Sequence, residues 1–329
     1  MRSRLLGIGL FSLIAFVAVF VALRLLSLRG DLSSIPDIER PGLLIPGFAL
    51  LGAAPLAYAL LWREIVSRLD GTRAPAVDAI AVFCASWLGR YVPTSLPYFA
   101  GKFALGMRLG IGKPALAASI LYENALFVSI GAASSSVLIP LSLTGEAGQP
   151  LVYAGAGLGG LAALGLLSPP VLHRAINAAA RFARRDPVPR KHLLSYRGIL
   201  SSAAWVTVGL AINGAGFALL LNAFVPLDAR ELVASAAIFN LAGVAGVAAV
   251  PVPSGIGVRE AVLIGLLQVF VPLEVAVAAA VLTRLVGVLG DVALGLAGGA
   301  MLTIRQRPSA REASAAQRAE DAVELGRAA

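Results

Sequence analysis

The sequence of 329 residues is 58% hydrophobic and only 14% charged, and its mean hydropathy is +0.84. Soluble domains carry about 25% charged residues, so this composition excludes a soluble globular domain and indicates an integral membrane protein. The net charge of +9 does not indicate nucleic acid binding, because the basic residues gather in short stretches between apolar segments and are expected to face anionic lipid headgroups. Cys84 is the single cysteine, so the sequence predicts no disulfide, no metal site and no other cofactor.

Two apolar stretches near the start are long enough to cross a bilayer. Residues 5–23 follow Arg2 and Arg4, which predicts a retained first transmembrane helix with its start in the cytoplasm. Residues 42–62 predict the return crossing, which ends at a basic stretch around Arg68. This stretch is therefore expected to be cytoplasmic.

Residues 76–113 predict a re-entrant hairpin rather than a crossing. They contain two short apolar pieces separated by a segment with Pro93 and Pro97, which cannot remain helical. The next helix, residues 114–141, leads to a loop without Lys or Arg at 144–150, which indicates the outer side. The hairpin must then begin and end on the cytoplasmic side.

The second half of the chain repeats this order in the opposite orientation. Residues 151–172 predict a crossing to the most basic loop, residues 198–224 an outward crossing, and residues 274–304 the final inward helix. Residues 231–271 then begin and end outside and predict a second hairpin. Its tip is at 251–257, where two prolines and two glycines break the helix.

The sequence therefore predicts an all-α polytopic membrane protein, with six full crossings and two broken hairpins. The predicted architecture is an inverted repeat of helix, helix, re-entrant hairpin and helix, with repeat A at about residues 5–143 and repeat B at about 150–305. A single transmembrane domain occupies residues 1–305, and residues 306–329 are expected to be a mobile cytoplasmic tail. The alternative that both broken segments are pairs of ordinary, kinked crossings stays open at this point.

Ionisable side chains at membrane depth are costly, so each is a candidate functional residue. Glu123 and Arg284 lie at matching depths of their helices, and we expect them to pair across the pseudo-twofold axis. Asp291 follows Arg284 by about two helical turns and is expected to share that arginine or line a path. The isolated amides Asn213 and Asn240 are interpreted as a helix–helix hydrogen bond.

Arg90, Lys102 and Arg259 lie at the tips or shoulders of the predicted hairpins. Half-helix ends there leave backbone N–H groups free, and cations beside such groups suit the phosphate of a headgroup. In the alternative interpretation, Arg90 and Lys102 only mark the cytoplasmic boundary and extend to water. Glu123 and Glu260 are candidate proton-coupling groups, because a carboxyl in a low-dielectric site titrates readily.

Several motifs together resemble the lysylphosphatidylglycerol synthase transmembrane-domain family, which is also described as flippase-like. The motifs are residues 252–260, residues 88–93 with Gly101-Lys102 downstream, Tyr122-Glu123 and Thr283-Arg284, and the resemblance covers about residues 5–305. Ser254 and Thr94 stand where the common pattern has glycine.

The charged residues and the family motifs together predict one substrate-binding or transport site and no catalytic residue. Its predicted members are Arg90, Tyr91, Lys102, Glu123, Pro253, Gly255, Gly257, Arg259, Glu260, Arg284 and Asp291. Polar and charged side chains from both hairpins would line a path for the headgroup while the acyl chains stay in the bilayer.

The resemblance implies lipid translocation. Some relatives carry a soluble aminoacyl-transferase domain, and none follows the membrane region in this sequence, so we expect translocation without aminoacyl transfer. The expected protein is a flippase that moves an anionic, modified or polyprenyl-linked lipid between leaflets of a bacterial-type inner membrane, with both termini cytoplasmic. Its expected partners are membrane lipids, and a lipid synthase or a second copy of the chain.

Two alternatives remain open from the sequence. One is a membrane-embedded enzyme that modifies lipids, with Glu260 or Glu123 as acid or base. The other is an accessory subunit that positions a lipid synthase.

Overall fold

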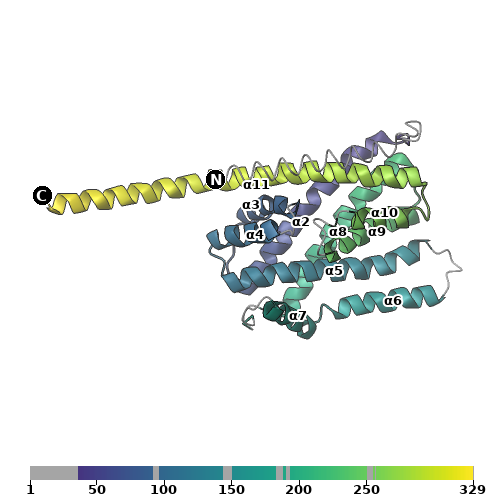
Figure 1. The fold of residues 1–329 in the computed structure, drawn as a ribbon, viewed down its shortest axis with the longest axis horizontal. Helices are drawn as coiled ribbons and strands as arrows, with labels where there is room; N and C mark the ends of the chain where they lie inside the picture. Colours follow the sequence, from purple (N-terminus) through teal and green to yellow (C-terminus); the bar gives the residue numbers. More distant parts are fainter. Residues whose placement is uncertain are drawn as a thin grey trace.

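The computed structural model describes residues 36–91, 96–143, 150–182, 188–189, 193–249, 255 and 257–328, and all regular structure within these ranges is helical (Figure 1). The all-α prediction is thereby confirmed. The first predicted crossing, residues 5–23, lies outside the described residues. The elements are η2 (Pro41–Leu43), α2 (Leu44–Asp70), α3 (Ala76–Trp87), η3 (Leu88–Tyr91), α4 (Leu96–Arg108), α5 (Lys113–Leu143), α6 (Pro150–Gly165), α7 (Pro169–Phe182), α8 (Tyr196–Phe224), α9 (Ala229–Ala248), α10 (Val258–Leu267) and α11 (Leu273–Ala328).

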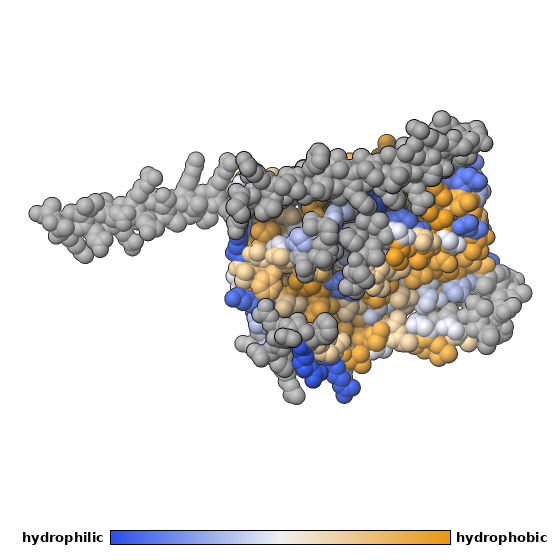
Figure 2. Space-filling model, viewed as in Figure 1, coloured by the Kyte–Doolittle hydropathy of each residue, from blue (hydrophilic) through white to orange (hydrophobic). Residues whose placement is uncertain are grey.

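Five helices in the described part of the chain are long and apolar enough to cross a membrane: Pro41–Asp70, Lys113–Leu143, Tyr196–Phe224, Ala229–Ala248 and Leu273–Arg305. Figure 2 shows hydrophobic residues over the middle of one face and hydrophilic residues mainly toward its two ends. This pattern matches an apolar bilayer core between two polar surfaces. The chain is a multi-pass membrane protein.

Helix α2 is longer than the predicted crossing of residues 42–62. It continues through Arg63 and Arg68, which were expected in a loop, and ends at Asp70. The added turns are supported by an ion pair one turn apart, in which the Arg68 Nε lies 2.6 Å from a Glu64 carboxylate oxygen. Gly71 then ends the helix in the left-handed conformation, with φ of +74°.

The predicted crossing of residues 151–172 is not one continuous helix. Helix α6 ends at Gly165, and α7 begins at Pro169 after a short turn. The break has a simple cause, because Pro169 and Pro170 carry no N–H group to bond the preceding turn. Sixteen residues rise about 24 Å, which is less than the 30 Å or so of a hydrocarbon core.

Helix α2 packs against α8, α3 against α11, α5 against both α9 and α6, and α8 against α9. Polar side chains join several of these helices. Asn213 of α8 donates a 3.1 Å hydrogen bond to Asn240 of α9, so both amides take part in a helix–helix hydrogen bond, as expected. At the end of the bundle, the Arg305 Nε of α11 lies 2.6 Å from an Asp78 carboxylate oxygen of α3.

Two pairs of consecutive helices, α3 with α4 and α9 with α10, occupy the two predicted hairpins and lie toward opposite ends of the bundle in Figure 1. Helices α3, α4 and α10 have 12, 13 and 10 residues. At 1.5 Å per residue, each rises about 15–20 Å and is too short to cross by itself. Helix α9, with 20 residues, is long enough to cross.

Each pair closes around a glycine. A Cβ on Gly89 would lie 2.3 Å from the backbone nitrogen of Tyr98, and a Cβ on Gly255 would lie 2.3 Å from the Gly246 Cα. Only glycine permits these backbone approaches. The connecting segment is therefore held directly against α4 in the first pair and against α9 in the second.

The last helix begins at Leu273, close to the predicted start, and extends beyond the bundle to Ala328 (Figure 1). The predicted tail, residues 306–329, is thus helical through Ala328. Its mobility stays a prediction.

The contact between Gly255 and Gly246 can be tested with Gly255→Ala. We expect a loss of about 2–4 kcal/mol in stability, because Gly255 has a φ of +61° and the added methyl group meets the α9 backbone. Thermal unfolding of the purified protein in detergent would measure the loss. Gly265→Ala, in open space on α10, is the matched control and is expected to be neutral or slightly stabilising.

Candidate functional site

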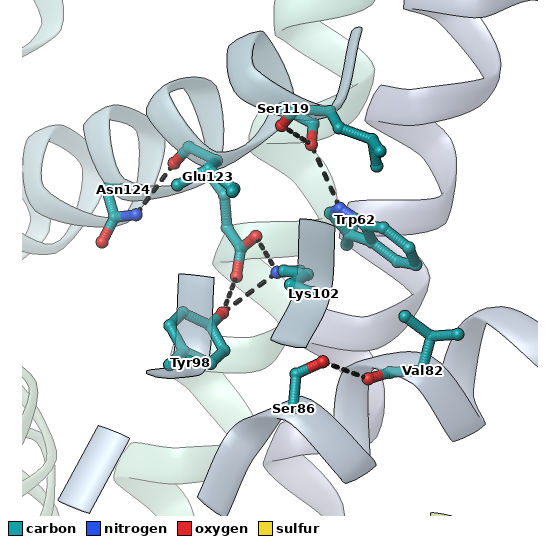
Figure 3. Close-up of polar contacts among 10 residues, drawn as sticks. Trp62, Val82, Ser86, Tyr98, Lys102, Ser119, Glu123 and Asn124 are labelled. Atoms are coloured by element: carbon teal, nitrogen blue, oxygen red, sulfur yellow. Dashed lines mark hydrogen bonds and ion pairs between the residues drawn. The ribbon is translucent and has the colours of Figure 1, made fainter. Parts of the chain in front are cut away.

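Lys102 of α4 and Glu123 of α5 form a buried ion pair (Figure 3). The Lys102 ammonium donates to one oxygen of the Glu123 carboxylate and, at 3.0 Å, to the Tyr98 hydroxyl. The Tyr98 hydroxyl in turn donates to the other Glu123 oxygen at 3.2 Å. Lys102 and Glu123 therefore each have two partners, and together the three side chains join α4 to α5.

Aromatic rings surround the Lys102 ammonium. It lies 4.4 Å from the centre of the Phe83 ring and 5.2 Å from that of Trp62, within the range of cation–π attraction. Lys102 is 0% exposed, so the alternative interpretation, in which it extends to water at the membrane boundary, is wrong. Because burial of an unpaired ammonium is very costly, Glu123 and these rings fix its position.

Glu260 of α10 and Arg284 of α11 form a second pair, with 3.8 Å between a Glu260 carboxylate oxygen and the Arg284 Nε. The other Glu260 oxygen accepts the Gly257 N–H at 2.7 Å, which caps the start of α10. The predicted pair of Glu123 with Arg284 is therefore wrong. Glu123 pairs instead with Lys102 of α4, the short helix just before α5, and Arg284 pairs with Glu260 of α10, the short helix just before α11.

Asp291 of α11 is held by residues of the first hairpin. One carboxylate oxygen accepts the Trp87 indole N–H at 2.9 Å, and the other accepts the Tyr91 hydroxyl at 2.5 Å. The Arg90 Nη1 lies 3.7 Å from the same oxygen as Tyr91. Asp291 thus pairs with Arg90, and the prediction that it shares Arg284 is wrong.

Three guanidinium groups meet where these networks adjoin. The guanidinium carbons of Arg90 and Arg284 lie 5.5 Å and 5.9 Å from the centre of the Tyr91 ring. Arg259 lies 4.7 Å from the centre of the Phe239 ring and experiences the charges of Arg90, Arg284 and Glu260. We call Arg90, Arg259 and Arg284 the arginine cluster.

The arginine cluster has more positive than negative charge. Three guanidiniums face two carboxylates, Glu260 and Asp291, which leaves an excess of one positive charge. Arg259 is in no ion pair within the described residues. Its charge is instead set against an aromatic ring, an arrangement that leaves its donors available to an anion.

The predicted site residues therefore fall into two groups. Arg90, Tyr91, Arg259, Glu260, Arg284 and Asp291 come together around the arginine cluster, with Gly257 bonded to Glu260. Lys102 and Glu123 form their own closed pair. Gly255 packs on α9, and Pro253 lies outside the described residues.

Sequence reasoning missed Trp87 and Tyr98 as members of these networks. A spacing signal was present, because Trp87 precedes Tyr91 by four residues and Tyr98 precedes Lys102 by four, which puts each pair on one side of a helical segment. Both aromatic residues supply the hydrogen bond donor that a buried carboxylate needs.

A family model described as the lysylphosphatidylglycerol synthase TM region matches residues 4–295 of the chain. No match was found among curated proteins.

The Lys102–Glu123 pair can be tested with Lys102→Met. Removing the ammonium leaves a carboxylate buried with only Tyr98 as partner, so we expect a loss of about 3–5 kcal/mol in stability. The double variant K102M/E123M removes both charges and is expected to regain most of that loss. Thermal unfolding of the single and double variants, combined as a mutant cycle, would measure the coupling.

The exposed pair of Glu64 and Arg68 provides the control, since Arg68→Met is expected to cost less than about 1 kcal/mol. A Lys102→Met variant as stable as Arg68→Met would show that the buried pair contributes little to the fold.

Proposed function

Since the chain belongs to the lysylphosphatidylglycerol synthase TM region family, we propose that it is a flippase, which moves an anionic, modified or polyprenyl-linked lipid between leaflets. Family membership itself indicates a membrane protein of lipid metabolism or transport. The finer proposal depends on the chemistry of the arginine cluster.

The observation that supports this proposal best is that three different elements supply the three arginines of the cluster. Arg90 comes from η3 of the first hairpin, Arg259 from α10 of the second, and Arg284 from the last long helix. Arg284 is about 11 residues, or roughly 17 Å, from the start of α11, near the middle of a hydrocarbon core. Cations at this depth suit a lipid phosphate on its way between leaflets.

The packing supports an inverted repeat with two opposed re-entrant hairpins, α3–α4 and α9–α10. Exchanging α2 with α8, α3 with α9, α4 with α10 and α5 with α11 converts the contact of α3 with α11 into that of α9 with α5. The contacts α2–α3, α3–α4 and α4–α5 likewise become α8–α9, α9–α10 and α10–α11. In transporters with such repeats, rocking of one half against the other opens a central site to each side in turn.

The networks suggest a role for each part. The arginine cluster would bind the headgroup phosphate, with Glu260 and Asp291 holding the arginines apart when the site is empty. The Lys102–Glu123 pair would keep α4 on α5. Glu123 and Glu260 remain the proposed proton-coupling groups. The proposed location is a bacterial-type inner membrane, with both termini cytoplasmic. The proposed partners are membrane lipids, and a lipid synthase or a second copy of the chain.

Leaflet exchange in liposomes tests the function. The purified protein would be reconstituted, and exchange of a fluorescent phosphatidylglycerol and an undecaprenyl phosphate analogue would be followed by quenching from outside. We expect exchange with the native chain and a loss of at least about tenfold in Arg284→Ala, because that variant removes a central phosphate ligand.

Arg108→Gln is the matched control, because Arg108 is exposed at the end of α4 and away from the cluster. It is expected to exchange lipid at the native rate. Absence of exchange for every lipid with a folded native chain would contradict the flippase proposal. Formation of a new lipid product in the same liposomes would instead favour the membrane-embedded enzyme.

A further inference from the structure

We infer that Trp87 is a positioning residue, which orients Arg90 for the headgroup and couples the arginine cluster to the buried Lys102–Glu123 pair. Trp87 is the last residue of α3, and η3, which carries Arg90, begins at the next residue. The inference rests on the proposed function and deepens it, because it names how one network would regulate the phosphate site in the other.

Trp87 contacts Arg90 directly. The Arg90 guanidinium carbon lies 4.4 Å from the centre of the Trp87 ring, within the range of cation–π attraction. The indole N–H of the same ring donates to one oxygen of Asp291 at 2.9 Å, and the Arg90 Nη1 lies 3.7 Å from the other oxygen. Trp87 therefore acts on Arg90 twice, through its own ring and through the carboxylate beside that arginine.

The Trp87 N–H limits how strongly Asp291 attracts Arg90. Both oxygens of the Asp291 carboxylate accept a hydrogen bond, one from Trp87 and one from the Tyr91 hydroxyl at 2.5 Å. Without the indole donor, one oxygen would be left to accept from the guanidinium, and a charge-assisted hydrogen bond of that kind is strong. Asp291 would then compete with a headgroup phosphate for Arg90.

Two further rings connect Trp87 to the Lys102–Glu123 pair. The Phe83 ring stacks on Trp87 with 4.9 Å between ring centres, and the Lys102 ammonium lies 4.4 Å from the centre of that same Phe83 ring. The Tyr98 ring meets Trp87 edge-on at 5.7 Å, and its hydroxyl donates to Glu123. Trp87 thus contacts two of the side chains that surround the ion pair.

The backbone next to Trp87 makes a second connection between the networks. A Cβ on Gly89 would lie 2.3 Å from the backbone nitrogen of Tyr98, so η3 is packed directly against the start of α4. Closely packed groups transmit a displacement, because one cannot move without the other. A shift of α4 that follows a change at Glu123, a proposed proton-coupling group, would therefore move Trp87 and Arg90 as well.

Trp87→Phe tests the positioning role, because it keeps a ring near Arg90 and removes the N–H donor to Asp291. We expect binding of phosphatidylglycerol, measured by native mass spectrometry in detergent, to weaken about fivefold. In the Asp291→Asn background, the same change is expected to weaken binding less than about twofold, because no charged carboxylate remains to compete. Trp205→Phe, on α8, is the matched control and is expected to bind as the native chain does.

A tryptophan that only stabilised the fold would cost the same affinity in both backgrounds. Equal losses, or a folded Trp87→Phe variant with native affinity, would therefore overturn the positioning role. If Trp87→Phe does not fold, Trp87→Tyr takes its place, since a phenol hydroxyl does not lie where the indole N–H does.

Tryptophan fluorescence tests the coupling without a ligand. Subtracting the spectrum of the matching Trp87→Phe variant gives the Trp87 emission in each background. We expect K102M/E123M to change this emission at least half as much as Arg90→Gln, which removes the guanidinium over the ring, while Arg108→Gln leaves it unchanged. In the Arg90→Gln background, K102M/E123M is expected to change it much less. Unchanged emission in K102M/E123M, or equal changes in both backgrounds, would overturn the coupling.

The two experiments separate this inference from the proposed function. A native chain that binds phosphatidylglycerol, with Trp87→Phe at native affinity, would overturn the inference and leave the phosphate site in place. Absence of binding by the folded native chain would contradict the proposed phosphate site and the positioning role together. The emission measurements would still decide whether Trp87 couples Arg90 to the ion pair.

Discussion

The cost of a charge in the hydrocarbon core constrains this molecule more than any other term. An ammonium or carboxylate there must meet an opposite charge or a dipole, so Lys102 is packed among aromatic rings and bonded to Glu123. The same requirement joins α10 to α11 through Glu260 and Arg284, and the first hairpin to α11 through Asp291. The hairpins are attached to the long helices by these contacts.

The two hairpins use the same device with the charges exchanged. In the first, the short helix supplies the cation Lys102 and the long helix the carboxylate Glu123; in the second, the short helix supplies Glu260 and the long helix Arg284. In the first pair the two opposite charges bond directly to each other, so the pair has no net charge. The second pair is looser and adjoins Arg90 and Arg259, so the excess positive charge collects on that side. In the proposed transport path, this asymmetry would make the arginine cluster the centre that binds an anion.

The charged residues of the site could be predicted from the sequence, but which of them form ion pairs with each other could not. Glu123, Arg284 and Asp291 were identified because an ionisable residue in an apolar run is rare, but their partners depend on which helices are neighbours. Depth along a helix suggested Glu123 with Arg284, whereas the nearest opposite charges are on the short hairpin helices. Trp87 and Tyr98 were missed because aromatic residues are common in membrane helices and only contact reveals their donor role.

The sequence by itself determined the membrane class, the long helices α2, α5, α8 and α11, and the two broken segments, because hydropathy and the positions of proline and glycine are local properties. The turn before Pro169 was not predicted, because the apolar stretch around it is nearly continuous and the missing N–H groups of the two prolines were given too little weight. Tertiary structure alone decided which charges meet, since a guanidinium finds its carboxylate through helix packing. The separation of a neutral Lys102–Glu123 pair from a positively charged arginine cluster follows from that packing.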